Sequence, residues 1–519
     1  MATGAVIPTT DWRTKTIIMS GGERLDVEPV LLDNKEPGAL IDSQNFESGL
    51  AGGYKRTKGY ALYSSSEVPG TGRNLGVFVH NNGVLACRDD SIYHGTTGTW
   101  GSDIAPAART SAGQYRAVRY TWSAGKRICL VDGVNDPVRF IATTGTELSN
   151  APTGATCVEE FKNRLVFGKG GILTYSVADD DTDYTTNNGG GAINIGDTIT
   201  GFGVWRKLLI IFCEGSIHRL AGSSASDFVV EPITEDFGCL HPDTIKGIRD
   251  DVVFLGPDGI RTVSATVKNV EVGVEAISTP VNQHIQDQMS IYQASGNISA
   301  ITVANKSQYR LFWSASTVAA TSAIGLNACL NRRQGTDEWE FFKLKGIQVA
   351  TGDSGRLDNN SELVVHSGHD GYVYSQETGD NYNNANISAY IQLPYLYLDD
   401  PALRKIFYRL KLIVDVEGSA VAELTTTLLL DDNDSTILQP SGLDMTSSIP
   451  TDVAVYGFTG GVGTGSLYGT MVYGQGASKN YRTGLVGGGQ NGSLKISSND
   501  TLPSYAIQTA ILEYELGAR

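Results

Sequence analysis

Gly83-Val84-Leu85-Ala86-Cys87, a short turn and Ser91-Ile92-Tyr93 form a hairpin phrase that this chain repeats. Each copy has a run of apolar and β-branched residues, a turn, and a second run. Clear copies recur at 127–140, 164–175, 207–220 and 251–263, and looser copies at 309–313 and 363–374. Runs of this composition separated by short turns are typical of paired antiparallel strands.

The spacing of the copies indicates the architecture. Aligned apolar positions in successive copies are 37 to 59 residues apart. A propeller blade of four strands needs roughly 40 to 50 residues, and a repeat built from hairpins favours radial repetition of small sheets. The sequence therefore predicts an all-β protein with a β-propeller of six or seven blades, complete or incomplete. Two stacked β-sandwiches whose hairpins recur by chance are the alternative.

The pattern divides the chain into three predicted segments. Residues 1–75 form an N-terminal arm and introductory segment, 76–380 the propeller, and 381–519 an additional C-terminal β-sandwich-like domain. In this last segment the runs at 387–398, 404–416 and 420–430 are longer and lack the short hairpin. The alternating stretch 504–516 is typical of a closing strand.

A glycine-rich stretch lies within the C-terminal segment. Thirteen of the residues from 457 to 492 are glycine, and ordering so many glycines is costly in conformational entropy. A long mobile loop and a glycine-rich strand pair docked on a neighbour explain it equally well. The candidate gate or interface residues in this stretch are Gly460, Gly461, Tyr468, Tyr473, Gly487 and Gly488.

Composition limits the remaining structure. With 61 glycines and 18% charged residues among 519, we expect little helix. The clearest helical stretch is 279–289, where Thr279 can cap the first turn and Pro280 occupies its first position. The six cysteines are widely spaced, so reduced core residues are expected. Neither a signal peptide nor a membrane-spanning run is recognisable, which predicts a protein that is made and kept in a cytoplasm or assembled there.

The formal net charge of −16 argues against binding nucleic acid through its phosphates. It is compatible with a different relation to DNA. A tube with an acidic lumen would repel a passing duplex and keep it from adhering to the wall.

Three carboxylate or histidine clusters are weak metal-site candidates. Asp179-Asp180-Asp181 with Asp183 could hold calcium but lacks the EF-hand pattern, so a solvated loop is favoured. The cluster of Asp431, Asp432 and Asp434 is an equally weak candidate, and a solvated loop is favoured there too. His366 and His369 with Asp370 lack a nameable further ligand, so a turn without a ligand role is favoured. No cofactor or metal is therefore expected.

Motifs of catalysis are not recognised. The chain has neither a G-x-S-x-G elbow nor a phosphate-binding P-loop, and Gly201-Phe202-Gly203 lacks the third glycine of a dinucleotide site. Nothing marks two carboxylates as a glycosidase pair. The sequence favours a protein that is not an enzyme.

Two stretches resemble a known family. One runs from Pro37-Gly38-Ala39 through Asn45, Gly52, Gly53, Lys55, Arg56, Gly59 and Tyr60. The other runs from Ile199 through Leu208–Phe212 and Ser216–Gly222 to Asp258-Gly259-Ile260, and the likeness continues at Asp370–Tyr374 and Leu403–Phe407. Both are similar to tail proteins of short-tailed bacteriophages, in which the first phrase introduces a propeller. The family is that of the podovirus tail nozzle, or tail tubular protein B, and related DNA-stabilising tail proteins.

The resemblance implies a structural role in the virion tail. Such proteins form a sixfold ring below the portal and adaptor, extend the DNA channel and retain the genome until ejection. It implies a homohexamer assembled in the host cytoplasm, with tail adaptor and tail fibre proteins as partners and double-stranded DNA passing without specific binding. Six copies, each with a net charge of −16, would repel DNA from the channel wall. The alternatives are a carbohydrate-binding or depolymerising propeller on a virion surface and a bacterial propeller scaffold.

Overall fold

The computed structural model describes residues 12–517, except for 51, 97, 112, 123–124, 223, 269–275, 293–295, 334–335, 399, 418–422, 437, 447–466, 469–470 and 473–478. The described chain forms two compact units. The propeller unit comprises Tyr60–Trp339 and Leu344–Thr378. The sandwich unit comprises the residues up to Gly59, Glu340–Lys343 and the residues from Gly379 onward.

Seven antiparallel sheets follow one another in the propeller unit, and we number them as blades 1 to 7. Blades 1 and 2 contain β6 (Asn74–His80), β7 (Gly83–Arg88), β8 (Ser91–Thr96), β9 (Thr99–Asp103), then β10 (Arg116–Trp122), β11 (Gly125–Val131), β12 (Val138–Ile141) and β13 (Thr144–Glu147). Blades 3 and 4 contain β14 (Cys157–Glu160), β15 (Leu165–Lys169), β16 (Ile172–Tyr175), β17 (Gly191–Asn194), then β18 (Ile199–Trp205), β19 (Leu208–Cys213), β20 (Ile217–Ala221) and β21 (Val229–Thr234).

The remaining blades are less regular. Blade 5 contains β22 (Lys246–Ile248), β23 (Asp251–Gly256) and β24 (Gly259–Thr262). Blade 6 contains β25 (Asn297–Val303), β26 (Gln308–Ser314), β27 (Ile324–Arg333) and β28 (Thr336–Lys345), and blade 7 contains β29 (Thr351–Arg356), β30 (Glu362–Ser367), β31 (Tyr374–Gln376) and β5 (Tyr60–Leu62).

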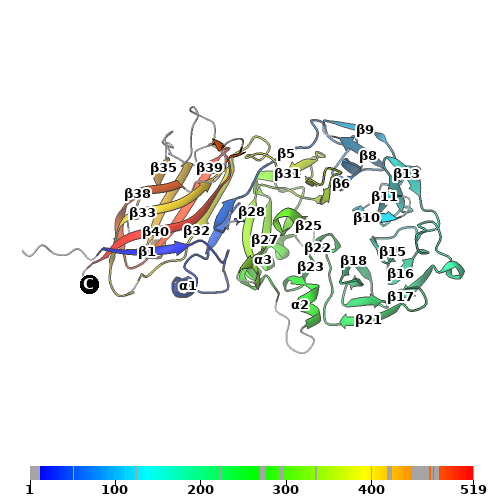
Figure 1. Cartoon of the computed structure of the whole chain (residues 1–519), viewed down its shortest axis with the longest axis horizontal. Helices are drawn as coiled ribbons and strands as arrows, with labels where there is room; N and C mark the ends of the chain where they lie inside the picture. The colour runs from blue at the N-terminus through cyan, green and yellow to red at the C-terminus, as the bar shows by residue number, and fades with distance from the viewer. Residues whose placement is uncertain are drawn as a thin grey trace, which may run out of the picture. The chain divides into compact units, whose positions relative to one another are not determined.

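All seven blades meet at one cavity. Its lining includes residues from the first strand of every blade, namely β6, β10, β14, β18, β22, β25 and β29. Sheets share a cavity in this way when they are arranged radially, as in a β-propeller. Figure 1 shows the inner strands of several blades around this centre. The predicted fold class is confirmed, and the residues that the structure describes form seven blades.

Neighbouring blades are held together by apolar side chains between their faces. Leu85 and Cys87 of blade 1 cluster with Ile128 and Leu130 of blade 2. Similar clusters join blades 2 and 3, 3 and 4, and 4 and 5. Burial of apolar surface between rigid sheets is the main source of stability for such a ring.

The ring is closed by a strand from the beginning of the propeller unit. β5 pairs with β31 of blade 7, with Tyr60 opposite Gln376 and Leu62 opposite Tyr374. Blades 7 and 1 then share an apolar cluster that includes Val77 and Val365. One blade thus combines strands from both ends of the unit, which links the two ends of the ring.

Helices occupy the connection between blades 5 and 6. They are α2 (Val263–Lys268), η3 (Thr279–Val281) and α3 (Asn282–Tyr292). The helix predicted at 279–289 is present, but the residue before its first turn is Ser278. The Thr279 hydroxyl instead donates a hydrogen bond to the Ala276 carbonyl at 2.7 Å.

The sandwich unit consists of two facing sheets. The first contains β3 (Phe46–Ser48), β4 (Tyr54–Arg56), β40 (Tyr505–Leu516), β33 (Lys405–Val416) and β38 (Lys479–Gly489), with β1 (Trp12–Ile18) also paired to β40. The second contains β2 (Asp42–Gln44), β32 (Ile387–Gln392), β39 (Gly492–Asp500), β34 (Glu423–Leu430) and β35 (Leu443–Thr446). Residues at alternate positions of β33 and β40 are buried, which is the pattern of a half-buried sheet.

Short elements complete the described chain. They are α1 (Pro29–Lys35), the two-residue strands β36 (Leu467–Tyr468) and β37 (Met471–Val472), and the 3-10 turns η1 (Thr186–Asn188), η2 (Pro242–Thr244), η4 (Ala304–Lys306), η5 (Ala320–Ser322) and η6 (Asp431–Asn433).

The division into 1–75, 76–380 and 381–519 needs correction. The described residues before Gly59 belong to the same unit as those after Gly379, because β1 and β4 pair with β40 and β2 pairs with β32. The propeller is inserted between the two parts of the sandwich sequence. Strands that pair across several hundred residues of sequence carry no local pattern that identifies their partner. The N-terminal segment therefore resembled a separate arm in the sequence.

The glycine-rich stretch also differs from a continuous loop. Its last part forms β38 and the start of β39, and β38 pairs with β33 over its length. Residues 447–466, 469–470 and 473–478 lie outside the described residues. The closing strand predicted at 504–516 is confirmed as β40.

The six cysteines are free and buried, as predicted. In the part of the chain that the structure describes, no helix has both the length and the apolar character of a membrane-spanning segment.

Candidate functional site

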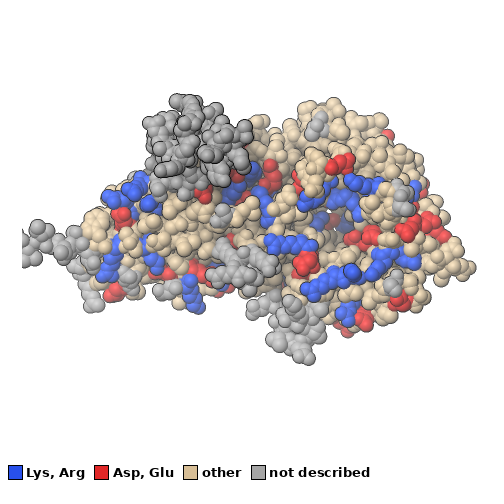
Figure 2. Space-filling model, viewed as in Figure 1, with Lys and Arg blue, Asp and Glu red and all other residues tan. Residues whose placement is uncertain are grey.

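The axial cavity of the propeller is the strongest candidate for a binding site. It has a volume of about 140 Å³ and is lined by both acidic and basic side chains. Figure 2 shows the propeller hollowed near its centre, with Lys and Arg side chains around the hollow and Asp and Glu side chains among them. Three cations, Arg116, Arg119 and Lys246, and three carboxylates, Glu159, Asp243 and Asp353, line the cavity.

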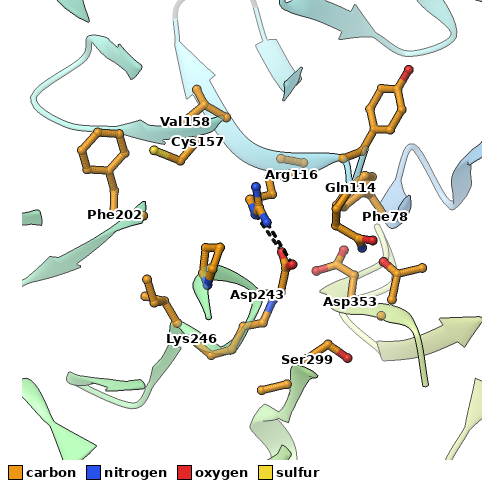
Figure 3. Close-up of a pocket in the computed structure, with 18 of the residues that line it drawn as sticks. Phe78, Gln114, Arg116, Cys157, Val158, Phe202, Asp243, Lys246, Ser299 and Asp353 are labelled. Atoms are coloured by element: carbon orange, nitrogen blue, oxygen red, sulfur yellow. Dashed lines mark hydrogen bonds and ion pairs between the residues drawn. The ribbon is translucent and has the colours of Figure 1, made fainter. Parts of the chain in front are cut away.

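Arg116 and Asp243 form an ion pair within the cavity. Arg116 projects from β10, and its Nε and Nη2 atoms donate to the two Asp243 oxygens at 2.8 and 3.0 Å. Figure 3 shows the two side chains pointing toward each other. Such two-point pairing orients both groups and is stronger than a single contact. Asp243 is therefore compensated rather than available as a free base.

Arg119 and Asp353 form a second pair. The Arg119 guanidinium donates to both Asp353 oxygens, at 3.2 Å for Nη2, and to the Ser354 carbonyl at 2.7 Å. The Asp353 carboxylate also accepts a hydrogen bond from the Val79 amide at 2.9 Å. This carboxylate thus links blade 7 to blades 1 and 2.

Lys246 lacks such a partner. Its ammonium donates no hydrogen bond to, and forms no ion pair within 4 Å with, any of the described residues. Burial lowers the pKa of Lys246, while Asp353 and Asp243 raise it by a smaller amount. Both of those carboxylates are already held by arginines, so the charge of Lys246 is only partly balanced.

Ser299 presents a second unsatisfied group. It lies on β25, is 4% exposed and lines the cavity, and its hydroxyl has no hydrogen-bond partner among the described atoms. A buried hydroxyl left without a partner costs free energy. Such a group is expected to bind water or a ligand.

Glu159 is the second charged side chain of the cavity without an ion-pair partner among the described residues. Burial raises its pKa to about 7, although the Glu160 amide donates a hydrogen bond to the carboxylate at 3.1 Å and opposes that rise. Its carboxyl group can therefore change protonation near neutral pH. A shifted pKa in a cavity marks a functional candidate, although buried structural groups show such shifts as well.

The depolymerase alternative would require two carboxylates placed for acid and nucleophile or base. In the axial cavity Asp243 and Asp353 are each paired with an arginine. Glu159 is the remaining carboxylate of the cavity lining.

The residues of the family-like phrase occupy defined positions in the sandwich unit. Asn45 adopts a positive φ of 56°, and its side-chain amide donates to the Ser388 carbonyl at 2.9 Å. Gly53 has a φ of 74°, and a Cβ atom there would lie 2.4 Å from the Ile507 carbonyl oxygen. Gly52 also has a positive φ, of 93°. A turn of this shape requires glycine.

Lys55 and Arg56 from the same phrase make ion pairs. Lys55 binds the Glu417 carboxylate. Arg56 is fully buried and its Nη1 atom lies 2.6 Å from an oxygen of Asp500. Both residues stabilise the sandwich, and neither lines the axial cavity.

Gly59 and Tyr60 stand where the chain enters the propeller unit. A Cβ atom on Gly59 would lie 2.0 Å from the Asn381 carbonyl oxygen. Tyr60 begins β5, and its ring makes edge contacts with His366 and Tyr374 at centroid distances of 5.2 and 5.3 Å. The phrase therefore ends on the strand that closes the ring.

The candidate gate residues are only partly placed. Gly487 and Gly488 lie in β38, paired with Phe407 and Ile406 of β33, so they are sheet residues and not part of a loop. Tyr468 lies in the short strand β36. Gly460, Gly461 and Tyr473 lie outside the described residues.

The expectation for the acidic cluster at 179–183 needs correction at Asp181. Asp181 is 2% exposed and pairs with Arg127 and with Arg139 at 2.5 Å, while the Tyr120 hydroxyl donates to it at 2.7 Å. Asp181 is thus a buried ion-pair centre between blades 2 and 3, whereas Asp179 and Asp180 are exposed, as expected of a solvated loop. The carboxylate of Asp180 accepts hydrogen bonds within its own turn.

The other suspected metal ligands have structural contacts. His366 is a buried residue of β30, not of a turn, and burial lowers its pKa to about 3. The hydroxyl of Ser314 and the ring of His369 are hydrogen-bonded at 2.9 Å. Asp431 accepts the Gln490 amide at 2.6 Å. Across the described ranges, His, Cys, Asp and Glu form no group of three or more that could hold a metal ion.

The axial residues carried no recognisable motif. They lie mainly on the first strands of the blades, whereas the repeated phrase covers the second and third strands. Charged residues within strands, such as Arg116, Arg119 and Lys246, were the only available signal. These side chains come together at one cavity only because the blades form a closed ring.

No family model matches the chain, and no curated protein sequence matches it. Solved structures with some similarity include the extracellular domain of a one component system from B. thetaiotaomicron, at 9% identity and a TM-score of 0.27, covering 56% of this chain and 38% of that chain. The AfRom2 CNH domain has 9% identity and a TM-score of 0.33, covering 62% and 99% respectively. An exo-beta-1,3-galactanase from Phanerochaete chrysosporium has 8% identity and a TM-score of 0.24, covering 88% and 99%. These TM-scores are too low to indicate a function.

Proposed function

We propose that this chain is a structural subunit of a short-tailed phage tail. Six copies form a ring that extends the DNA channel below the portal and adaptor, retains the genome and then releases it. One observation carries the proposal. The phrase from Asn45 to Tyr60 resembles the segment that introduces the propeller in such tail proteins, and here Tyr60 begins the strand that closes a propeller.

The dimensions of the axial cavity determine where a channel would run. A volume of about 140 Å³ cannot admit a DNA duplex, and the Arg116–Asp243 pair lies within it. The proposed channel is therefore enclosed by the ring of subunits, and each propeller serves as a wall. The acidic balance of the chain supports this role, since a net charge of −16 per copy repels DNA at long range.

The proposal includes contacts with other tail components. A closed ring uses heterologous contacts between neighbouring copies, and tail adaptor and tail fibre proteins would bind the assembled ring. DNA would pass without specific binding, and the protein would reside in the virion tail after assembly in the host cytoplasm.

The oligomeric state tests the proposal directly. Light scattering over a range of concentrations, with negative-stain microscopy of the same samples, should show a particle six times the chain mass of 55.4 kDa with an axial hole. The Arg482→Leu variant, altered at an exposed position of β38, serves as a control for surface changes.

A role in the tail also predicts that the protein is found in virions. Antibody labelling of virions should mark the tail, and mass spectrometry of purified particles should detect the chain. A purified protein that stays a single disc, together with its absence from particles, would contradict the proposal. Saccharide binding by that disc would favour the carbohydrate alternative.

A further inference from the structure

The axial cavity contains a cation that its surroundings leave partly unbalanced. The two nearby carboxylates that act on Lys246, Asp243 and Asp353, are paired with Arg116 and Arg119. Glu159 is not among the charges that act on Lys246. The region near Lys246 therefore has a positive excess.

Ser299 adds an independent observation on the next blade. Its hydroxyl is buried, unpartnered among the described atoms and part of the same cavity lining as Lys246. Lys246 begins β22 and Ser299 lies in β25, the first strands of neighbouring blades. An ammonium and a hydroxyl are both donors that a negatively charged oxygen can satisfy.

The space is large enough for a ligand. A cavity needs roughly 10–15 Å³ to hold one water molecule, so the volume of about 140 Å³ corresponds to several waters or a compact anion. Its lining is mainly polar at the centre, where Arg116, Asp243 and Asp353 are drawn in Figure 3. The cavity suits a small hydrophilic ligand.

We propose that the axial cavity binds a small oxyanion, with the Lys246 ammonium and the Ser299 hydroxyl as donors. An oxyanion supplies the counter-charge that the Lys246 ammonium lacks and satisfies the buried Ser299 hydroxyl. Charge-assisted hydrogen bonds of this kind are stronger than neutral ones. The inference concerns the propeller alone and does not depend on a role in phage tails.

Inorganic phosphate is the first probe. Thermal unfolding and isothermal calorimetry of the full chain are measured with phosphate, with acetate and with chloride at matched ionic strength. Saturable binding of phosphate or acetate, with a rise in Tm that chloride does not give, is expected. Phosphate alone would identify a tetrahedral oxyanion site, and acetate alone a carboxylate site.

Two variants locate the site. Lys246→Met should weaken binding about tenfold or more, because it removes a charged donor. Ser299→Ala should weaken it less and should fold normally, since it removes a hydroxyl that has no protein partner. Lys169→Met, at an exposed position of β15, is the matched control and should bind as the parent does.

Three results would overturn the proposal. One is the absence of saturable binding by either anion, which would leave a cavity filled by water. Another is unchanged binding in both Lys246→Met and Ser299→Ala. The third is equal weakening by Lys169→Met, which would indicate general charge effects. If Lys246→Met fails to fold, Ser299→Ala still decides the question.

Discussion

Arg56 is completely buried, and its Nη1 atom donates a hydrogen bond to the carboxylate of Asp500 at 2.6 Å. The guanidinium also donates to the Leu502 carbonyl and lies 5.5 Å from the centre of the Tyr505 ring. A residue near the start of the chain is thereby fixed to the connection between β39 and β40. This pair holds the two sheets of the sandwich unit together.

Arg56→Leu should strongly destabilise the sandwich unit. Removing one partner of a buried ion pair leaves the other charge uncompensated, which costs about 3–5 kcal/mol. Urea unfolding measures the loss. Arg482→Leu, on the exposed face of β38, should change the free energy of unfolding by no more than about 0.5 kcal/mol. Equal effects of the two variants would contradict the role assigned to Arg56.

Gly59→Ala should destabilise the protein through a steric clash. The new Cβ would lie 2.0 Å from the Asn381 carbonyl oxygen and 2.6 Å from its amide nitrogen, so the backbone must shift. The expected cost is about 1–3 kcal/mol. Thermal unfolding is the measurement, and Gly484→Ala is the control because its Cβ would have only one neighbour, at 3.9 Å. A tolerated Gly59→Ala would show that the connection is not tightly packed.

Asp181→Asn should destabilise the propeller by about 3–5 kcal/mol, because Arg127 and Arg139 would lose their shared buried counter-charge. The neighbouring Asp180→Asn is the matched control. It retains an oxygen that can accept the turn hydrogen bonds from the Thr182 amide and hydroxyl, so a change within about 0.5 kcal/mol is expected. Added calcium or a chelator should leave the Tm of the parent unchanged. A calcium-dependent Tm would instead identify the acidic cluster as a metal site.

Glu159 should make stability depend on pH. Its pKa is raised from 4.5 to about 7, so the folded state retains a proton that the unfolded state has lost between these values. The contribution is fully present below pH 4.5 and is lost as the pH rises through about 7. A shift of this size corresponds to at most about 3 kcal/mol, and solvent in the cavity reduces it.

Glu159→Gln should remove this part of the pH dependence. The free energy of unfolding of both proteins is measured in urea at several values from roughly pH 5 to 8. As the pH rises, the free energy of the parent should fall relative to that of the variant. Parallel curves for the two proteins would show that Glu159 does not titrate in this range.

The blades could be predicted because their middle strands are buried on both faces. Leu85 in β7 and Phe212 in β19 are completely buried, and such strands appear in the sequence as continuous apolar runs. The repeated phrase corresponds to the second and third strands of the blades. The first and fourth strands have mixed patterns, so the repeat alone could not indicate them or fix the number of blades at seven.

The candidate site was less predictable. The phrase from Asn45 to Tyr60 was recognisable because turns with positive φ require glycine at Gly52 and Gly53. Nothing nearby in sequence marks Lys246 or Ser299, which become neighbours of one cavity only when blades 5 and 6 take their places in the ring. The acidic run at 179–183 suggested a solvated loop, whereas folding places Asp181 between two arginines.

Local chemistry in the sequence thus established the strands, the reduced cysteines and the propeller class, because hydrophobic runs and turn residues act over short distances. Tertiary structure alone decided the closure of blade 7 by β5, the joining of residues before Gly59 to those after Gly379, and the charge balance of the axis. These features depend on pairing between segments hundreds of residues apart, as between Lys55 and Ala506. Such pairings are selected by the packing of the whole core and leave no periodic signal in either segment.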